Sequence, residues 1–340
     1  MRLEYIHHQL LPEVTLESYT SDRLKESWIE LLTTEKAFHL FVPKQFGGLE
    51  LSMSQGILAL TSVSKIHGSL GWVLNLGAGA NYFSGFFEED VALELFKYNS
   101  TVLAGSGGAT GTARKINKKY IINGKWDKCT GAAHASHFTF NAVHKDGRIS
   151  SFVIPRAEVT TQNNWPIVGL KATSSFGITI ENQLVKEQHR FIIGELKNNF
   201  NYSVFQLDFE EFARLCMSAS YIGIVGCFVR YYENQLLERK IDETVLLKNI
   251  KKMLASSQSS LQECAHLFDQ LKELNPKEKE TAELLLYNHL PEKHIELFMF
   301  VQQIYLEAGM SITQESNLIH WAYRDVLTAI HHYMLRPAAL

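Results

Sequence analysis

The sequence predicts an α+β protein in which a β-rich region at residues 101–195 separates two helical regions at residues 1–100 and 196–340. Apolar residues recur with helical spacing before residue 100, short β-prone runs follow, and helical spacing returns after residue 200. A chain of 340 residues exceeds one ordinary hydrophobic core. We therefore expect an N-terminal helical domain, a central β domain and a C-terminal helical bundle.

In the first region, FVPKQFGGLELS separates two helical patterns. Pro43 and the pair Gly47-Gly48 predict a turn, and Ser52 is a suitable N-cap for the helix that follows. The apolar residues with helical spacing are Leu24, Trp28, Leu31 and Leu32, then Ile57, Leu58, Leu60, Val63 and Ile66.

The central region contains the β-prone runs KYIINGKW, HFTFNAVH, ISSFVIP and FGITIENQLV. In the first of these, Asn123-Gly124 lies between apolar residues. This dipeptide favours a two-residue hairpin turn, because both turn positions need positive φ. Several short strands at this spacing predict a small sandwich or barrel.

The last region contains an apolar stripe that ends in small residues, which allow two helices to approach closely. We expect this helix to be central in a bundle. Asn275-Pro276 predicts a turn followed by a further helix. The stripe consists of Phe205, Phe209, Phe212, Cys216, Ala219, Ile222, Gly223 and Gly226.

Composition argues against several classes of protein. A net charge of −3 gives no reason to expect binding to nucleic acid or to an anionic membrane. The four cysteines form no CxxC motif and are typical of reduced cytosolic thiols. The start MRLEYIHHQLLPE is too charged for a signal peptide, and the apolar run at 217–229 is too short to span a bilayer. We expect a cytoplasmic protein.

Six motifs, in order along the chain, resemble those of the acyl-CoA dehydrogenase superfamily of flavoenzymes. The closest resemblance is to its flavin-dependent (group D) monooxygenase branch. The resemblance implies an acyl-CoA dehydrogenase-like fold: a helical domain, a β-barrel or sandwich, and a four-helix bundle. The motifs are FVPKQFGGLELS, GSLGW, AGSGGATGTARK, INGKWDKCTGAAHASHF, GLKATSSFGITIENQLV and RDVLTAIHH.

The resemblance implies a flavin site on the β domain. Thr130 would face flavin N5, because a hydroxyl can donate to N5 of oxidised flavin and accept from N5–H of reduced flavin. The alternative is a threonine that bonds its own turn backbone. Thr110 and the neighbouring amides of Gly108 and Ala109 would contact the pyrimidine edge, unless this glycine-rich segment is merely a flexible loop. Lys128 would lie near N1 or N5, or point to solvent.

The glutamate that serves as base in the dehydrogenases has no counterpart here. Its usual position corresponds to Tyr333, and a second position known in some relatives corresponds to Ala213. Tyrosine titrates near pH 10 and is a poor base at neutral pH. α,β-Dehydrogenation of a thioester would therefore need a base that the sequence does not offer.

In the monooxygenase branch a histidine of the last helix lies above the flavin. Here that residue is His332, which would share a helix face with Asp325 and Thr328 at positions i, i+3 and i+7. An imidazole suits proton exchange near neutral pH. The alternative is that His331 and His332 simply end the final helix, where the macrodipole favours them.

Other motif positions are altered. Arg239 remains from a cofactor-binding segment, but LEAGMS replaces the Gly-Gly-x-Gly that receives the FAD pyrophosphate. This favours FMN, or reduced flavin taken from a reductase, over tightly bound FAD. Glu211 and Arg214, an acidic-x-x-Arg pair, and Tyr333 are candidate substrate contacts. Glu263 and His266 form a single ExxH, whereas a di-iron site needs two, so no metal is predicted.

Three functions remain open from the sequence. The first is a two-component monooxygenase that uses reduced flavin and O2 on a small organic substrate, with a separate flavin reductase as partner. The second is an acyl-CoA dehydrogenase with a displaced base. The third is a non-catalytic helical binding subunit. The resemblance also implies a homodimer or homotetramer, and a substrate pocket between the β domain and the last bundle.

Overall fold

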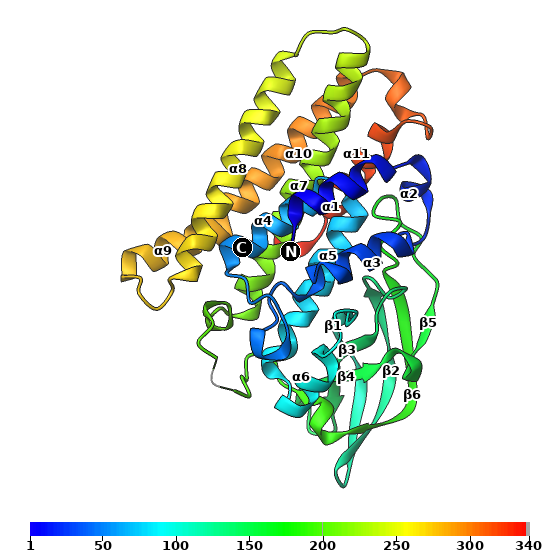
Figure 1. Ribbon diagram of the computed structural model, residues 1–340, viewed down its shortest axis with the longest axis vertical. Helices are drawn as coiled ribbons and strands as arrows, with labels where there is room; N and C mark the ends of the chain where they lie inside the picture. Colours follow the sequence, from blue (N-terminus) through cyan, green and yellow to red (C-terminus); the bar gives the residue numbers. More distant parts are fainter. Residues whose placement is uncertain (199, 338–340) are drawn as a thin grey trace.

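A computed structural model describes residues 1–198 and 200–337. Helices of both ends of the chain lie together, and the sheet lies at one end of the molecule (Figure 1). The helices before the sheet are α1 (Leu3–Leu10), α2 (Leu16–Thr20), α3 (Glu26–Thr34), α4 (Met53–Ser64), α5 (Gly68–Asn81) and α6 (Glu89–Phe96). Those after it are α7 (Phe209–Glu238), α8 (Val245–Asp269), α9 (Pro276–Leu284), α10 (Leu290–Glu307) and α11 (Leu318–Ala329).

The turn signals of the helical regions are confirmed. Ser52 caps α4 by accepting a hydrogen bond from Gln55 N–H, and Gln55 completes a capping box. Gly47 has a φ of +84°, as the predicted turn requires. Asn275 caps α9 through the backbone N–H groups of Lys277 and Glu278. Local chemistry therefore fixes where these helices begin.

The seven strands form one sheet in the order β5-β6-β2-β1-β3-β4-β7. The edge strands β5 and β7 do not pair with each other in the described chain, so the sheet is not a closed barrel. It curls around a core of its own, because the Tyr120 ring of β2 lies 5.2 Å from the Phe152 ring of β4, two strands beyond its neighbour. The strands are β1 (Leu103–Ile116), β2 (Lys119–Cys129), β3 (His137–His144), β4 (Ile149–Pro155), β5 (Thr160–Gln162), β6 (Phe176–Lys186) and β7 (Arg190–Phe191).

The hairpin predicted at Asn123-Gly124 is wrong. β2 runs through this dipeptide, and the turn between β1 and β2 lies earlier, where Asn117 has a φ of +53°. Packing explains the motif instead. A Cβ on Gly124 would lie 2.5 Å from the Cα of Gly111 and 2.7 Å from the Trp126 ring, so glycine there leaves room for the indole. Trp126 Nε1–H then donates to the Asn141 carbonyl at 2.9 Å.

Helix α7 is the central helix, as its small residues predicted. It contacts α4, α5, α8, α10 and α11. A Cβ on Gly223 would lie 2.4 Å from Ser64 Cβ and 2.6 Å from the Thr61 carbonyl, so α4 and α7 cross in near-backbone contact. The Thr61 hydroxyl donates to the Ala219 carbonyl at this crossing. α7 is long and apolar enough to cross a membrane, but 89% of its apolar window is buried inside the protein.

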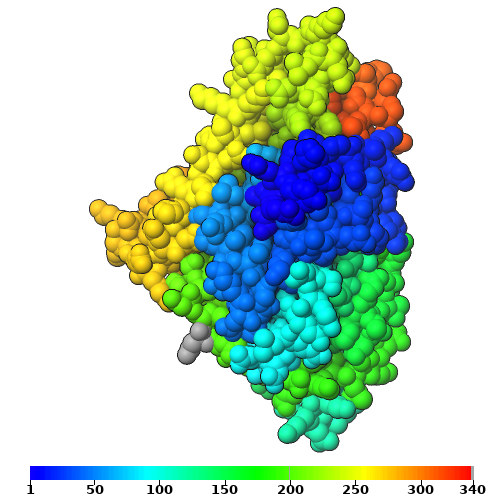
Figure 2. Space-filling model, viewed as in Figure 1, coloured from blue at the N-terminus to red at the C-terminus, as the bar shows by residue number. Residues whose placement is uncertain are grey.

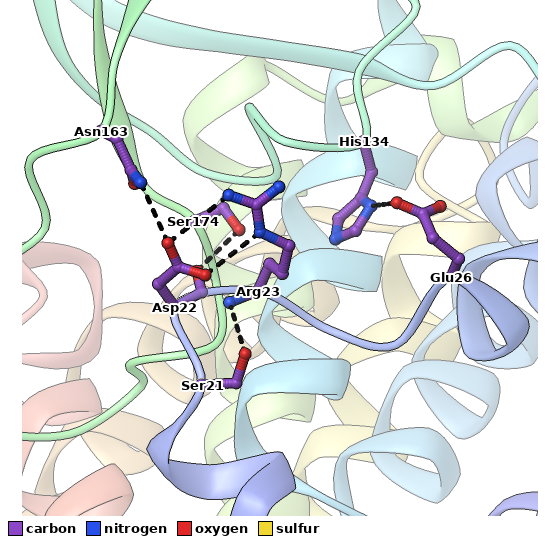
Figure 3. A network of polar contacts seen from close by, with 7 residues as sticks. All are labelled: Ser21, Asp22, Arg23, Glu26, His134, Asn163 and Ser174. Carbon is purple, nitrogen blue, oxygen red and sulfur yellow. Dashed lines mark hydrogen bonds and ion pairs between the residues drawn. The ribbon is translucent and has the colours of Figure 1, made fainter.

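The N-terminal helices cover the surface between the C-terminal helices and the sheet (Figure 2). Polar contacts join this segment to the β region (Figure 3). The Asp22 carboxylate accepts a hydrogen bond from Asn163 Nδ2 at 3.0 Å. The backbone carbonyl of Asp22 accepts one from the Ser174 hydroxyl at 2.9 Å. His134 approaches Glu26 at 3.5 Å. The contact to Ser174 holds the loop at residues 169–175 from one side, and the other two join neighbouring parts of the β region.

The crossing of α4 and α7 yields a test. Gly223→Ala should destabilise the protein by about 1–3 kcal/mol, because its methyl group meets backbone and Cβ atoms that cannot move independently. Gly226→Ala is the matched control, since its Cβ would meet only the flexible Lys65 side chain. The control should be neutral or stabilising by up to about 1 kcal/mol through helix propensity. Urea unfolding measures both; equal effects would contradict the close crossing.

Candidate functional site

A cavity of 420 Å³ lies where the sheet meets α5, α7 and the segment 332–334. Its β wall is formed by Gly105, Ser106, Gly107, Thr130, Thr139, Phe140, Asn141 and Ser151. Its helical wall includes Asn75, Leu76, Gly79, Ala80, Phe209, Phe212, Ala213, Cys216 and Met217. Phe83, Phe191, Ile193, His332, Tyr333 and Met334 complete the wall. A volume in this range is typical of small-molecule sites, which hold about 300–1,000 Å³.

The glycine-rich strand β1 supplies a wall with few side chains, and its register against β3 shifts between Ser106 and Gly111. A Cβ on Gly105 would lie 2.3 Å from the Thr139 carbonyl, so glycine lets β1 and β3 approach closely. Gly107 has nothing within 4 Å of its Cβ position, and its carbonyl accepts from Asn141 Nδ2 at 3.0 Å. Ser151 donates to Asn141 Oδ1 at 2.6 Å. Asn141 and Ser151, which also line the cavity, thus fix the strand, and the missing side chain at Gly107 leaves room for a planar ligand.

Thr130 follows the end of β2 and lies in the cavity wall. Gly131, at a φ of +78°, turns the chain directly after it. The Thr130 hydroxyl bonds to the Ser175 hydroxyl at 2.8 Å rather than to its own turn backbone. The structure therefore does not show the alternative interaction, a hydrogen bond from Thr130 to its own turn backbone.

Both positions where a dehydrogenase base would be expected lie in the cavity wall. They are occupied by Ala213 and Tyr333, and the lining residues include no Asp or Glu. The wall therefore offers no carboxylate that could remove a proton from a thioester.

His332 lines the cavity, but it is not on the last helix. α11 ends at Ala329, and His332 is extended, with a φ of −68° and a ψ of 130°. The predicted helix face shared with Asp325 and Thr328 is therefore wrong. The alternative, that the histidines end the helix, fits His331, whose Nδ1 bonds to the Leu327 carbonyl of the last turn at 2.7 Å, but not His332. His332 instead caps the 3₁₀ turn at 333–335, because its Nδ1 accepts from Met334 N–H at 3.4 Å.

The imidazole of His332 is neutral at pH 7. Burial, together with the positive charges of Arg336, Lys128 and Arg214, lowers its pKa to about 4. Since Nδ1 accepts a hydrogen bond, the proton of the neutral ring lies on Nε2. The edge of Trp72 packs against the ring, with centroids 5.8 Å apart, and Tyr333 stacks on it at 5.0 Å. His332 is thus a hydrogen-bond donor more readily than a base.

Arg214 does not form the predicted pair with Glu211. Its Nε donates to Glu210 at 2.9 Å, and its guanidinium donates to the Met334 carbonyl at 3.1 Å. Glu211 instead accepts from Asp208 N–H in the capping box of α7. Arg214 is 4% exposed and outside the cavity wall. It therefore fixes the backbone beside His332 rather than contacting a ligand in the cavity.

A buried carboxyl group, Asp325, connects the last helix to the β region. Its Oδ1 accepts from Leu170 N–H at 2.5 Å, and the Thr328 hydroxyl accepts from Gly169 N–H at 2.9 Å. A Cβ on Gly68 would lie 2.3 Å from Asp325 Oδ2. A Cβ on Gly169 would lie 2.0 Å from the carbonyl oxygen of Arg324, the residue before Asp325, so both positions need glycine to let α11 approach. Burial raises the pKa of Asp325 to about 7.

Comparisons with known proteins show which proteins this chain is similar to. Oxygenase subunit HsaA of a flavin-dependent monooxygenase from Mycobacterium tuberculosis is 27% identical over 243 residues, which is 66% of this chain and 61% of HsaA. A pigment production hydroxylase from a Rhodococcus strain is 31% identical over 150 residues, 43% of this chain and 39% of that protein. The homologues of this chain are thus oxygenase subunits of flavin-dependent monooxygenases. The chain spans less than two thirds of the length of these curated relatives.

Solved structures show the same fold. The 3-HSA hydroxylase of Rhodococcus sp. RHA1 superimposes with a TM-score of 0.88 at 18% identity, over 99% of this chain and 94% of that one. XiaF from Streptomyces, solved with FADH2 and glycerol, gives 0.84 at 20% identity, over 98% and 91%. These chains belong to the acyl-CoA dehydrogenase-like monooxygenase family. No model of a protein family matches this chain.

Several predicted flavin contacts of this family fall outside the cavity wall. Gly108, Ala109 and Thr110 lie beyond it, and the Thr110 hydroxyl donates to the Lys125 carbonyl. Lys128 is exposed, although its charge reaches His332. Arg239 lies roughly 30 Å along α7 from Met217, since a helix rises about 1.5 Å per residue. Arg239 there donates to Ser311 Oγ at 2.9 Å.

Several residues of the cavity wall were not predicted from the sequence of this chain. Asn75, whose Nδ2 donates to Met217 Sδ at 3.0 Å, lines the cavity, as do Cys216 and Asn141. Asn75 belongs to α5, the helix that begins with GSLGW, but no local motif distinguishes Asn75 from a core polar residue. The described residues contain no group of three or more His, Cys, Asp or Glu suited to a metal, and Glu263 and His266 belong to no such group.

The neutral state of His332 yields a pH test. Its pKa is lower in the folded protein than the usual 6.5, so protonation favours unfolding, and stability is lost as pH falls from about 6.5 to about 4. His332→Asn keeps a capping oxygen for Met334 N–H but removes the titration. Between pH 7 and pH 5 this variant should lose less stability than the wild type, by up to about 2 kcal/mol.

Urea unfolding at both pH values measures the difference, and His331→Asn is the control. His331 is exposed, and its Nδ1 bonds to the Leu327 carbonyl. An identical pH dependence in His332→Asn and the wild type would show that His332 is solvated in the folded protein.

Proposed function

We propose that this chain is the oxygenase component of a two-component flavin-dependent monooxygenase. It would receive reduced flavin from a separate reductase and use O2 to oxygenate a small organic substrate. One observation supports this most strongly: a single cavity contains the Thr130 hydroxyl and a neutral His332, and no carboxylate lines it. The sequence relatives that act as oxygenase subunits support the same proposal.

The residues of the cavity fit a flavin ring. Gly105, Ser106 and Gly107 leave an open wall for a planar system, and Thr130 offers a polar atom at its edge. Phe209 and Phe212 exclude water from the helical side. When bound, reduced flavin would supply the electrons that activate O2. The protein's own groups would orient the ring and the substrate.

His332 would act as a hydrogen-bond donor through Nε2–H to an oxygen that gains charge during the reaction. A donor of this kind in a dry cavity contributes about 3–4 kcal/mol to the transition state. Tyr333 contributes the neighbouring wall and would contact the substrate. Arg214 and Glu211 would act from outside the wall, by fixing the segment 332–334 and the start of α7.

An acyl-CoA dehydrogenase activity has no support in this cavity, because Ala213 and Tyr333 replace both candidate bases. The choice between FMN and FAD depends on the adenosine half. Arg239 lies far from the cavity of its own chain, so it could contact that half only across a subunit interface of a homodimer or homotetramer. We favour FMN or transiently bound reduced FAD, a four-helix bundle formed by α7, α8, α10 and α11, and a cytoplasmic location.

The proposal is tested by anaerobic titration of the protein with reduced FMN and reduced FAD, followed by mixing with ¹⁸O2 and an aromatic probe. Phenol, indole, indole-3-acetate and 4-hydroxyphenylacetate form a useful panel. Binding of reduced flavin and ¹⁸O in an organic product are the expected results. Absence of flavin binding would contradict the proposal and favour a non-catalytic binding subunit. Bleaching of bound oxidised FAD by an acyl-CoA would favour a dehydrogenase.

His332→Phe tests the assignment of the donor. The variant keeps an aromatic ring between Trp72 and Tyr333, so reduced-flavin affinity should change by less than about threefold. Product formation from the best probe should fall about 100- to 1,000-fold. His331→Phe is the control, because that side chain is exposed and lies outside the wall. Unchanged product formation in His332→Phe would remove His332 from the chemistry.

A further inference from the structure

Three hydroxyl groups form a hydrogen-bonded chain behind the cavity wall. The Thr130 hydroxyl lies 2.8 Å from that of Ser175, which lies 2.9 Å from that of Thr173. The Thr173 hydroxyl donates to the Leu170 carbonyl at 2.8 Å. All three side chains are buried. The chain therefore runs from the cavity to a backbone carbonyl without contact with solvent.

Counting hydrogens fixes the direction of this chain. Each hydroxyl has one hydrogen, and a carbonyl only accepts. The Thr173 hydrogen must lie toward Leu170, so the Ser175 hydrogen lies toward Thr173 and the Thr130 hydrogen lies toward Ser175. Reversal would leave two oxygens 2.8 Å apart with no hydrogen between them. Thr130 consequently presents only lone pairs to the cavity.

The end of the chain is held rigidly. The Leu170 carbonyl also accepts from Trp165 Nε1–H at 3.0 Å, and Leu170 N–H is bound by Asp325. The Thr173 carbonyl accepts from Gly131 N–H at 2.9 Å, directly beside Thr130. Leu170 has a φ of +53°, a left-handed conformation that persists only where the surroundings enforce it. The carbonyl cannot swing away to release Thr173.

We infer that this hydroxyl chain makes the cavity selective for reduced over oxidised flavin, with Ser175 and Thr173 as positioning residues. The inference rests on the proposed function, in which Thr130 faces N5 of a flavin. Reduced flavin carries a hydrogen on N5 and can donate it to Thr130. Oxidised flavin has only a lone pair on N5, which would face the lone pairs of Thr130. A flavin that has given up its electrons is thereby released, as exchange with a reductase requires.

The size of the preference follows from the unsatisfied contact. A buried polar group left without a partner loses about 1–3 kcal/mol, so the wild type should bind reduced FMN roughly 10- to 100-fold more tightly than oxidised FMN. Other features of the cavity can add to such a preference. The test therefore depends on variants that free or remove the Thr130 hydrogen.

Anaerobic fluorescence and absorbance titrations with oxidised FMN and with dithionite-reduced FMN measure both dissociation constants. Ser175→Ala frees the Thr130 hydrogen to turn toward N5, so oxidised FMN should bind about tenfold more tightly while reduced FMN changes little. Thr173→Val removes the acceptor that orders Ser175, and the preference should fall part of the way. Thr130→Val should lower the preference by the opposite route, through weaker binding of reduced FMN.

Ser174→Ala is the matched control. Ser174 belongs to the same loop, but its hydroxyl donates to the Asp22 carbonyl, outside the chain (Figure 3). It should leave the ratio of the two constants unchanged. An unchanged ratio in both Ser175→Ala and Thr173→Val, while wild type still binds reduced FMN, would overturn this inference and leave the proposed function standing. Failure of wild type to bind either form would overturn both.

Discussion

The candidate site depends on the burial of Asp325 between three segments that are far apart in the sequence. Its carboxyl group accepts a hydrogen bond from Leu170 N–H and occupies the space that a side chain at Gly68 would fill. Asp325 itself belongs to α11, the helix that precedes His332. Backbone N–H groups buried without partners would destabilise this loop. Asp325 and Thr328 satisfy two of them, and the loop they hold carries Thr173 and Ser175 to Thr130. One helix thus positions both the hydroxyl chain and the start of the segment 332–334.

Electrostatics in the cavity follow from what surrounds it. Arg336, Lys128 and Arg214 disfavour a charged His332, and no acidic residue of the wall opposes them. Asp325 has the opposite problem: burial raises its pKa to about 7, so its ionisation costs stability as pH rises through neutrality. A neutral imidazole and a carboxyl group near half ionisation are both consequences of a dry interior. The neutral imidazole suits the proposed binding of a flavin ring in the cavity, whereas Asp325 lies outside the cavity wall.

The sequence predicted well wherever local chemistry decides the structure. Caps at Ser52 and Asn275, the turn at Gly47 and the close helix crossing at Gly223 need only a few neighbouring atoms. Predictions failed where distant packing decides. Asn123-Gly124 has the composition of a hairpin turn, but the ring of Trp126 needs the space, and the turn formed at Asn117. His332 was placed on a helix because its spacing from Asp325 fits one, yet α11 ends at Ala329. Arg214 has two acidic neighbours, and helical spacing alone does not say which one it pairs with. The direction of the Thr130 hydroxyl is set by a loop more than 40 residues later, so no motif around Thr130 contains it.

We propose that a reduced flavin binds with N5 on Thr130 and with its ring in the cavity beside His332. A crystal structure of the protein grown anaerobically with reduced FMN tests this most directly. The ring should lie against Gly105–Gly107, with N5 within about 3.2 Å of Thr130 Oγ1. A ring bound elsewhere, or one whose N5 faces a different side chain while Thr130 keeps only its bond to Ser175, would contradict it.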